Sequence, residues 1–204
     1  FLAFRALVLA AIAGVCVFVF AQGSANGAVI WGARGIALVI ASVLVAALDN
    51  NRVFGVVHKI TGASHWLFPQ LDGKWNARLC SNWPRVERTF NAAKAGGPPF
   101  DALTDDLSSA DEARRYLDAE VTITCTLFEI TMTLRPVKSH RVSRTRFMRP
   151  LWNKPALPEL SYVFEQEDTD PIANTDEKTH YGAGIIRYDP DTGELAGYYW
   201  NNRK

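Results

Sequence analysis

The residues in this chain that are best suited to chemistry are basic and aromatic side chains in its second half. Seven basic residues and no acidic residue occur between positions 135 and 154, whereas seven acidic residues and no basic residue occur between 159 and 177. Phe147 and Trp152 lie within the basic stretch, and this mixture offers charge for phosphate groups and aromatic faces for a nucleobase. Two other interpretations stay open: the basic stretch can rest on anionic lipid headgroups, or the two stretches can attract each other as solvated faces.

Catalytic and metal-binding patterns are poorly represented. The segment Gly182-Ala183-Gly184 continues with Ile-Ile-Arg, which fits neither a dinucleotide loop nor a phosphate loop, and no Gly-x-Ser-x-Gly or Walker pattern occurs. The four histidines have no partners at the spacing of metal ligands, and the acidic segment 165–170 fits no calcium-loop template. We therefore expect no catalytic residue, no metal and no cofactor. A hydrolase with an unfamiliar site, for example with His180 close to Asp176, ranks last among the alternatives.

The first quarter of the chain is almost uncharged. Residues 1–48 contain only two charged side chains, Arg5 and Arg34, although the whole chain is 21% charged. The runs 6–21 and 28–48 each approach or reach the roughly 20 residues that cross a bilayer core, and a short polar turn separates them. We therefore predict a hairpin of two transmembrane helices over residues 1–48. The alternative for the first run is a cleaved signal peptide, because small residues follow it.

The basic residues that flank the two runs predict their orientation. Arg5 precedes the first run, whereas Arg52 and Lys59 follow the second, and the turn between the runs carries no charge. The positive-inside tendency places both termini in the cytoplasm. We expect a juxtamembrane linker over 49–65 and a cytoplasmic domain over 66–204, attached to a membrane. The net charge of +1 argues against a general binder of DNA or RNA.

The predicted cytoplasmic domain consists of short segments in which apolar and polar residues alternate, as is typical of β-strands. Strands are expected at 71–80, 121–134, 142–148, 160–165, 180–188 and 195–201. The parity of the apolar residues changes inside 121–134, which we interpret as a bulge or sharp bend. One helix should run from Ser81-Asn82-Trp83-Pro84 to Ala95, and a capping box of Ser109 and Glu112 should start another, through Leu117. This pattern predicts a compact antiparallel β-barrel or sandwich with short helices.

Three groups of segments occur together in a particular order. They are Leu71-Asp72-Gly73-Lys74-Trp75 leading into Ser81-Asn82-Trp83-Pro84; Leu160-Ser161-Tyr162-Val163-Phe164-Glu165 followed by Thr175-Asp176-Glu177 and His180-x-Gly182; and Leu195-Ala196-Gly197-Tyr198-Tyr199-Trp200-Asn201-Asn202-Arg203. With two hydrophobic runs ahead of them, the chain resembles the two-transmembrane, β-strand-rich effectors of bacterial CBASS antiphage defence. The resemblance covers essentially the whole chain.

This resemblance implies a lipocalin-like β-barrel that binds a cyclic dinucleotide made by a partner nucleotidyltransferase. Binding would cause the membrane hairpins to form a homo-oligomer that disrupts the inner membrane and kills the infected cell. In that family the chain continues beyond the Tyr-Trp-Asn-Arg region to a further strand. We therefore expect the last strand of the barrel to be missing here and both ends of the chain to be incomplete.

Ten residues are the candidates for contact with the ligand. Arg144, Arg146 and Arg203 are expected to contact phosphate; Trp83, Tyr162, Tyr198 and Trp200 to stack on bases or form pocket walls; and Ser81, Asn82 and Asn202 to form hydrogen bonds. Trp75 is assigned to the core. The alternative function is a membrane-anchored β-barrel that binds a lipid or another apolar molecule. An apolar interior would favour that alternative, whereas two or more arginines converging on a pocket would oppose it.

Overall fold

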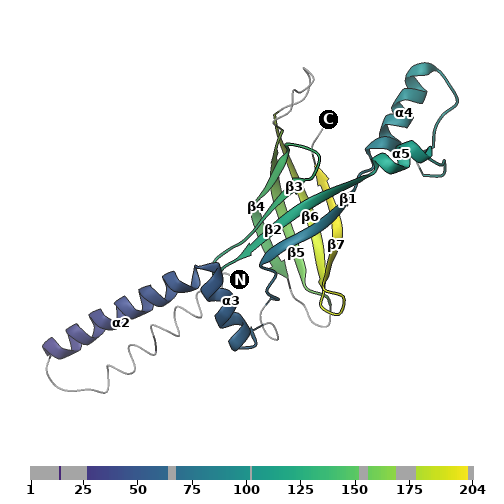
Figure 1. Cartoon of the computed structure of the whole chain (residues 1–204). Helices are drawn as coiled ribbons and strands as arrows, with labels where there is room; N and C mark the ends of the chain where they lie inside the picture. The colour runs from purple at the N-terminus through teal and green to yellow at the C-terminus, as the bar shows by residue number, and fades with distance from the viewer. Residues whose placement is uncertain are drawn as a thin grey trace.

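One curled antiparallel sheet dominates the protein. The computed structural model describes residues 14, 27–63, 68–101, 103–151, 156–168 and 178–201. Within them, seven strands follow one another in the sheet in chain order, each antiparallel to the next. They are β1 (Gly73–Cys80), β2 (Tyr116–Cys125), β3 (Ile130–Pro136), β4 (Val142–Leu151), β5 (Glu159–Glu167), β6 (Thr179–Asp189) and β7 (Glu194–Asn201). The sheet curls into a half-barrel (Figure 1), which confirms the prediction of a mainly antiparallel β fold.

Side chains alternate between the concave and convex faces of the sheet, as expected for extended backbone. Along β1 the half-buried residues are the odd-numbered ones, from Gly73 to Leu79, as the alternation predicts. Trp75 packs against the core, and its indole Nε1 donates to the carbonyl oxygen of Leu71 at 3.0 Å. Its ring meets that of Tyr188 on β6 edge-on, with 6.4 Å between centroids. The assignment of Trp75 to the core is therefore confirmed.

The buried core lies toward one end of the sheet. Its members are Leu71, Val121, Ile123, Cys125, Ile130, Met132 and Leu160. Helix α3 (Asn51–Ile60) covers this end: Phe54 packs against the cluster, and the buried His58 donates from Nε2 to the carbonyl oxygen of Phe68 at 3.0 Å. Each fully buried leucine or isoleucine contributes about 1.5–3 kcal/mol, so this end supplies much of the stability of the fold.

The prediction of one long strand over 121–134 is wrong. Strand β2 ends at Cys125 and β3 begins at Ile130, so a hairpin turn separates them. In the turn, Thr126 Oγ1 accepts hydrogen bonds from the backbone N–H groups of Phe128 and Glu129, at 3.2 and 3.0 Å. The change of parity marks this turn. The irregularity in strand pairing lies instead in β4, between Thr145 and Phe147.

Two short helices lie at the other end of the sheet, opposite α3 (Figure 1). Helix α4 (Trp83–Ala95) has Pro84 in its first turn and ends at Ala95, as the sequence predicted. Gly96 caps it with a left-handed φ of 61°. Helix α5 (Ser109–Arg114) differs from the prediction. Its capping residue is Ser108, which accepts from the N–H of Asp111, and Tyr116 and the residue after it already belong to β2.

Helix α2 (Gly27–Leu48) coincides with the second hydrophobic run, and Asn50 caps the start of α3 by accepting from the N–H of Arg52 at 3.0 Å. The predicted first run and the turn after it lie outside the described residues, apart from Gly14. In the described part of the chain, no individual helix has the combined length and apolarity of a membrane span; the pieces Val39–Leu48 and Asn51–Ile60 meet that test only together, across a bend of 93°.

Candidate functional site

The concave face of the sheet lines a cavity of about 710 Å³ at the end that carries α4 and α5. This volume lies within the range of about 300–1,000 Å³ that is common for sites of small ligands. Its lining combines apolar side chains with aromatic and cationic ones. The aromatic residues are Trp83, Tyr116, Tyr162, Phe164, Tyr199 and Trp200, and the cationic residues are Arg114, Arg115 and Arg141.

Two aromatic rings of β5 lie across β6 at the wall of the cavity. Tyr162 pairs with Gly184 and Phe164 pairs with Gly182. A Cβ atom added at Gly184 would come within 2.4 Å of the Tyr162 ring, and one at Gly182 within 2.3 Å of the Phe164 ring. Because neither glycine has a side chain, each ring can occupy the space above its partner strand. The two glycines thus leave room for the Tyr162 and Phe164 rings at this place on the concave face.

The phenols of Tyr162 and Tyr199 are close enough to influence each other. Burial raises the pKa of Tyr162 to about 12, and the neighbouring Tyr199 adds to that increase. Burial also raises the pKa of Tyr199. Both phenols are therefore protonated at physiological pH, and each can donate a hydrogen bond to an acceptor on a ligand.

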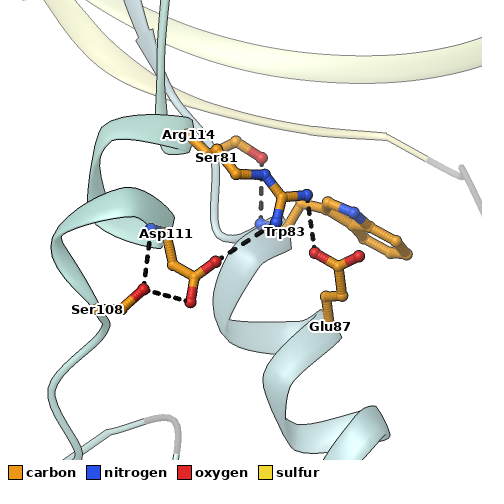
Figure 2. Close-up of polar contacts among 6 residues, drawn as sticks. All are labelled: Ser81, Trp83, Glu87, Ser108, Asp111 and Arg114. Carbon is orange, nitrogen blue, oxygen red and sulfur yellow. Dashed lines mark hydrogen bonds and ion pairs between the residues drawn. The ribbon is translucent and has the colours of Figure 1, made fainter.

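Arg114 joins the two helices at the edge of the cavity (Figure 2). Its guanidinium lies 2.8 Å from the carboxylate of Glu87 on α4 and 3.4 Å from that of Asp111 on α5. Ser108 holds Asp111 by donating from Oγ at 2.7 Å. Because both carboxylates lie outside the lining, the cavity is in contact with the arginine only.

The other two arginines are held in a similar way. Nη1 of Arg115 donates to both carboxylate oxygens of Glu112, at 2.8 and 3.1 Å, and this contact raises the pKa of Arg115. Nε of Arg141 donates to the buried carboxylate of Asp168 at 2.7 Å. No Asp or Glu occurs among the described residues that line the cavity. A guanidinium has five N–H donors, so each arginine has capacity for an anionic group on a ligand.

Five of the ten predicted ligand contacts line this cavity. They are Ser81, Asn82, Trp83, Tyr162 and Trp200. The first three lie at the start of α4, where Ser81 Oγ accepts a hydrogen bond from the backbone N–H of Trp83 at 3.1 Å (Figure 2). Asn202 and Arg203 lie outside the described residues. For all ten residues, contact with a ligand stays a prediction.

The structure places Arg144, Arg146 and Tyr198 outside the lining. Ser143 and Thr145 of β4 face the cavity, and successive residues of a strand point to opposite faces, so Arg144 lies on the convex face, where it pairs with Glu167 of β5 at 3.1 Å. Arg146 lies at the irregularity of β4, so alternation does not place it; its exposed guanidinium pairs with Glu165 of β5. Tyr198 is 80% exposed.

The residues that sequence reasoning missed are Arg114, Arg115, Arg141 and Tyr199. Arg141 belongs to the basic stretch, and Tyr199 is adjacent to a predicted contact, so the phase of the alternation could have identified them. Arg114 and Arg115 gave no comparable signal, because the turn from α5 into β2 brings them to the cavity. The basic and acidic stretches also meet along β4 and β5 in the ion pairs Arg144–Glu167 and Arg146–Glu165, which is the mutual attraction that the sequence left open.

The described part of the chain contains no group of three or more His, Cys, Asp or Glu residues arranged to hold a metal ion. Asp176 lies outside that part, so the arrangement suggested for His180 is not described. Comparisons of the chain with protein-family models, with curated proteins and with solved structures give no match.

Proposed function

We propose that the curled sheet is the receptor for a cyclic dinucleotide, and that binding promotes assembly of the chain in a bacterial inner membrane during antiphage defence. The observation that carries this proposal is the composition of the cavity. Three arginines and several aromatic side chains line it, without a described carboxylate. A cyclic dinucleotide presents the matching groups, two phosphodiesters and two flat bases.

The positions of the arginines suit a compact ligand with two anionic groups. Arg114 and Arg115 lie at the end of α5, whereas Arg141 lies just before β4, so separate elements bring these charges to the cavity. Trp83 also lines the cavity, is 56% exposed and offers an aromatic face for stacking. The protonated phenols of Tyr162 and Tyr199 can donate to base or ribose acceptors.

The membrane part of the proposal rests on the uncharged N-terminal sequence. It is supported by a direct connection between the helices and the receptor, since the backbone N–H of Leu127, in the turn between β2 and β3, donates to the carbonyl oxygen of Leu48 at 3.1 Å. A ligand that binds an assembled state more tightly than the monomer must favour assembly.

A second candidate, a receptor for a lipid or another apolar molecule, is favoured by part of the same lining. Leu117, Met132, Leu134, Pro136 and Phe164 give the lining an apolar part. A fatty acid could place its chain there and its carboxylate at an arginine. We rank this candidate second because three arginines exceed the need of one carboxylate.

Calorimetric titration of the full chain in lipid nanodiscs tests the proposal. The panel contains cyclic dinucleotides, linear dinucleotides and a fatty acid. We expect a Kd in the micromolar range or below, about −8 kcal/mol or stronger, for a cyclic species alone. Absence of cyclic dinucleotide binding by the folded chain would contradict the proposal, and binding of the fatty acid would favour the second candidate.

Arg114→Ala is the informative variant in this titration, and Arg187→Ala is its matched control. Both arginines are more than half exposed and pair with a glutamate, at 2.8 Å for Arg114 and 3.0 Å for Arg187, so neither change should unfold the protein. Only Arg114 lines the cavity. We expect Arg114→Ala to weaken binding at least tenfold and Arg187→Ala to leave it unchanged.

A further inference from the structure

Helix α3 has an apolar stripe that no described part of the protein covers. Val53, Val56, Val57 and Ile60 are 40%, 58%, 40% and 80% exposed. Their spacing of i, i+3, i+4 and i+7 places them along one side of the helix. Single exposed apolar residues are common on protein surfaces, but four along one short helix form a continuous patch.

The opposite side of α3 is occupied by the protein itself. Phe54 packs against the core, and the buried His58 donates to Phe68. Asn51 lies 3.5 Å from Asp72, between its Nδ2 and the carboxylate oxygen. The stripe begins at Val53, two residues after Asn51, and two residues correspond to a rotation of about 200° around the helix axis. The stripe therefore faces directly away from the sheet.

Two basic side chains lie along one flank of this helix. Arg52 and Lys59 are seven residues apart, so they share that flank between the stripe and the sheet-facing side. Both are exposed, and neither forms an ion pair with another described residue. An apolar stripe beside unpaired basic residues is typical of helices that lie in a membrane interface.

The neighbouring helix leads to the same side. Helix α2 leads away from the sheet, and α3 begins where the end of α2 meets the sheet (Figure 1). The described pieces of the two helices meet at 93°. Val39, Ile40, Val43 and Leu44 of α2 are exposed and apolar as well. If α2 follows the membrane normal, α3 lies parallel to the membrane plane with its stripe toward the lipid.

We propose that α3 binds the surface of an anionic bilayer, with its apolar stripe in the boundary between headgroups and acyl chains. This inference rests on the membrane part of the proposed function, because α2 must enter the same bilayer. Helices α4 and α5 lie at the opposite end of the sheet (Figure 1). The end of the sheet that carries the cavity therefore lies away from the lipid, on the side of a ligand dissolved in the cytosol.

Fluorescence quenching from within the lipid tests this placement on the full chain. One label is attached at Val56→Cys, and a second variant carries it at Val137→Cys, a valine of similar exposure (64%) in the turn after β3 at the far end of the sheet. Cys16→Ser and Cys80→Ser remove reactive thiols, while the buried Cys125 stays. The protein is reconstituted in vesicles of equal parts phosphatidylcholine and phosphatidylglycerol, with or without bromine on the acyl chains.

We expect bromolipid to quench the label at Val56→Cys several times more strongly than the label at Val137→Cys. A label at Val43→Cys shows separately whether α2 enters the bilayer. Quenching at position 43 but not at 56 overturns the inference and leaves the membrane part of the proposed function standing. Quenching at neither position overturns both. Disulfide cross-linking of Val56→Cys between two copies, without quenching, also overturns it and makes the stripe a contact between copies.

The basic flank gives a second, independent readout. Arg52→Gln combined with Lys59→Gln should lower the quenching at position 56 to the level measured in pure phosphatidylcholine. Lys138→Gln, an exposed lysine at the far end of the sheet, is the matched control and should change nothing. Equal quenching by the double variant and the parent in anionic vesicles would overturn the role of the two basic residues. Binding of the cyclic dinucleotide is measured separately, so its failure would not be confused with these outcomes.

Discussion

The two ends of the sheet are built from the same alternation of inward and outward side chains, yet one end is filled and the other is hollow. Near α3 the inward residues include Ile123, Ile130 and Leu160, which are at most 7% exposed. Near α4 and α5 the inward residues include Ser143, Gly182 and Gly184, and a cavity remains. The difference teaches that alternation defines a face, whereas the size of the side chains on that face decides whether it becomes a core or a site.

The largest expected effect comes from truncating the filled end. Leu71 is 1% exposed, and Leu71→Ala should lower the free energy of unfolding by about 2–5 kcal/mol, because it leaves a cavity in a packed core. Leu79→Ala removes the same atoms at the hollow end, where the leucine already lines a cavity, and should cost less than half as much. Denaturant unfolding of both variants is the measurement. Equal losses would mean that the two ends are packed alike.

The next effect concerns pH and the hollow end. The pKa of Tyr162 is about 12 in the folded protein and about 10 in an unfolded chain, so its stabilising effect is complete below pH 10 and is lost as the pH rises toward 12. The loss should be roughly 2–3 kcal/mol, from about 1.4 kcal/mol per pKa unit. Tyr162→Phe should remove most of this fall in stability between pH 10 and 12. Tyr198→Phe, the same change at an exposed position, should retain it.

A smaller effect is expected from filling the hollow end. Gly184→Val places a side chain where the Tyr162 ring lies, since an added Cβ would be 2.4 Å from that ring. We expect a loss of about 1–3 kcal/mol from overpacking and a larger, at least tenfold, loss of ligand affinity as the ring is displaced into the cavity. Thermal unfolding and the calorimetric titration separate the two effects. Unchanged affinity would place the ligand elsewhere on the protein.

The smallest effect is expected on the convex face. Arg144 and Glu167 are both more than half exposed, so Arg144→Ala should change stability by less than about 1 kcal/mol. If the ligand occupies the cavity, its affinity should also stay the same, although sequence reasoning placed Arg144 among the phosphate contacts. A clear loss of affinity in this variant would move the site toward the convex face.

Sequence reasoning came closest where the signals are local. Most strand positions and the shared face of β1 follow from alternation, and both ends of α4 follow from Pro84 in the first helical turn and from the glycines and prolines that come after Ala95. The region 121–134 shows the limit of such signals. A bulge and a tight turn both change the parity of apolar residues, and only pairing between β2 and β3 distinguishes them.

The amino-acid sequence by itself determined where most of the strands lie along the chain, the almost uncharged first quarter and the separation of basic from acidic residues. Only the tertiary structure decided which residues surround the cavity. Arg141 lines it while Arg144 pairs with Glu167 outside, because the curl of the sheet makes one face of β4 concave. Arg114 reaches the same cavity from a separate helix. Period-two alternation is encoded within a strand, but which face becomes concave depends on all seven strands together.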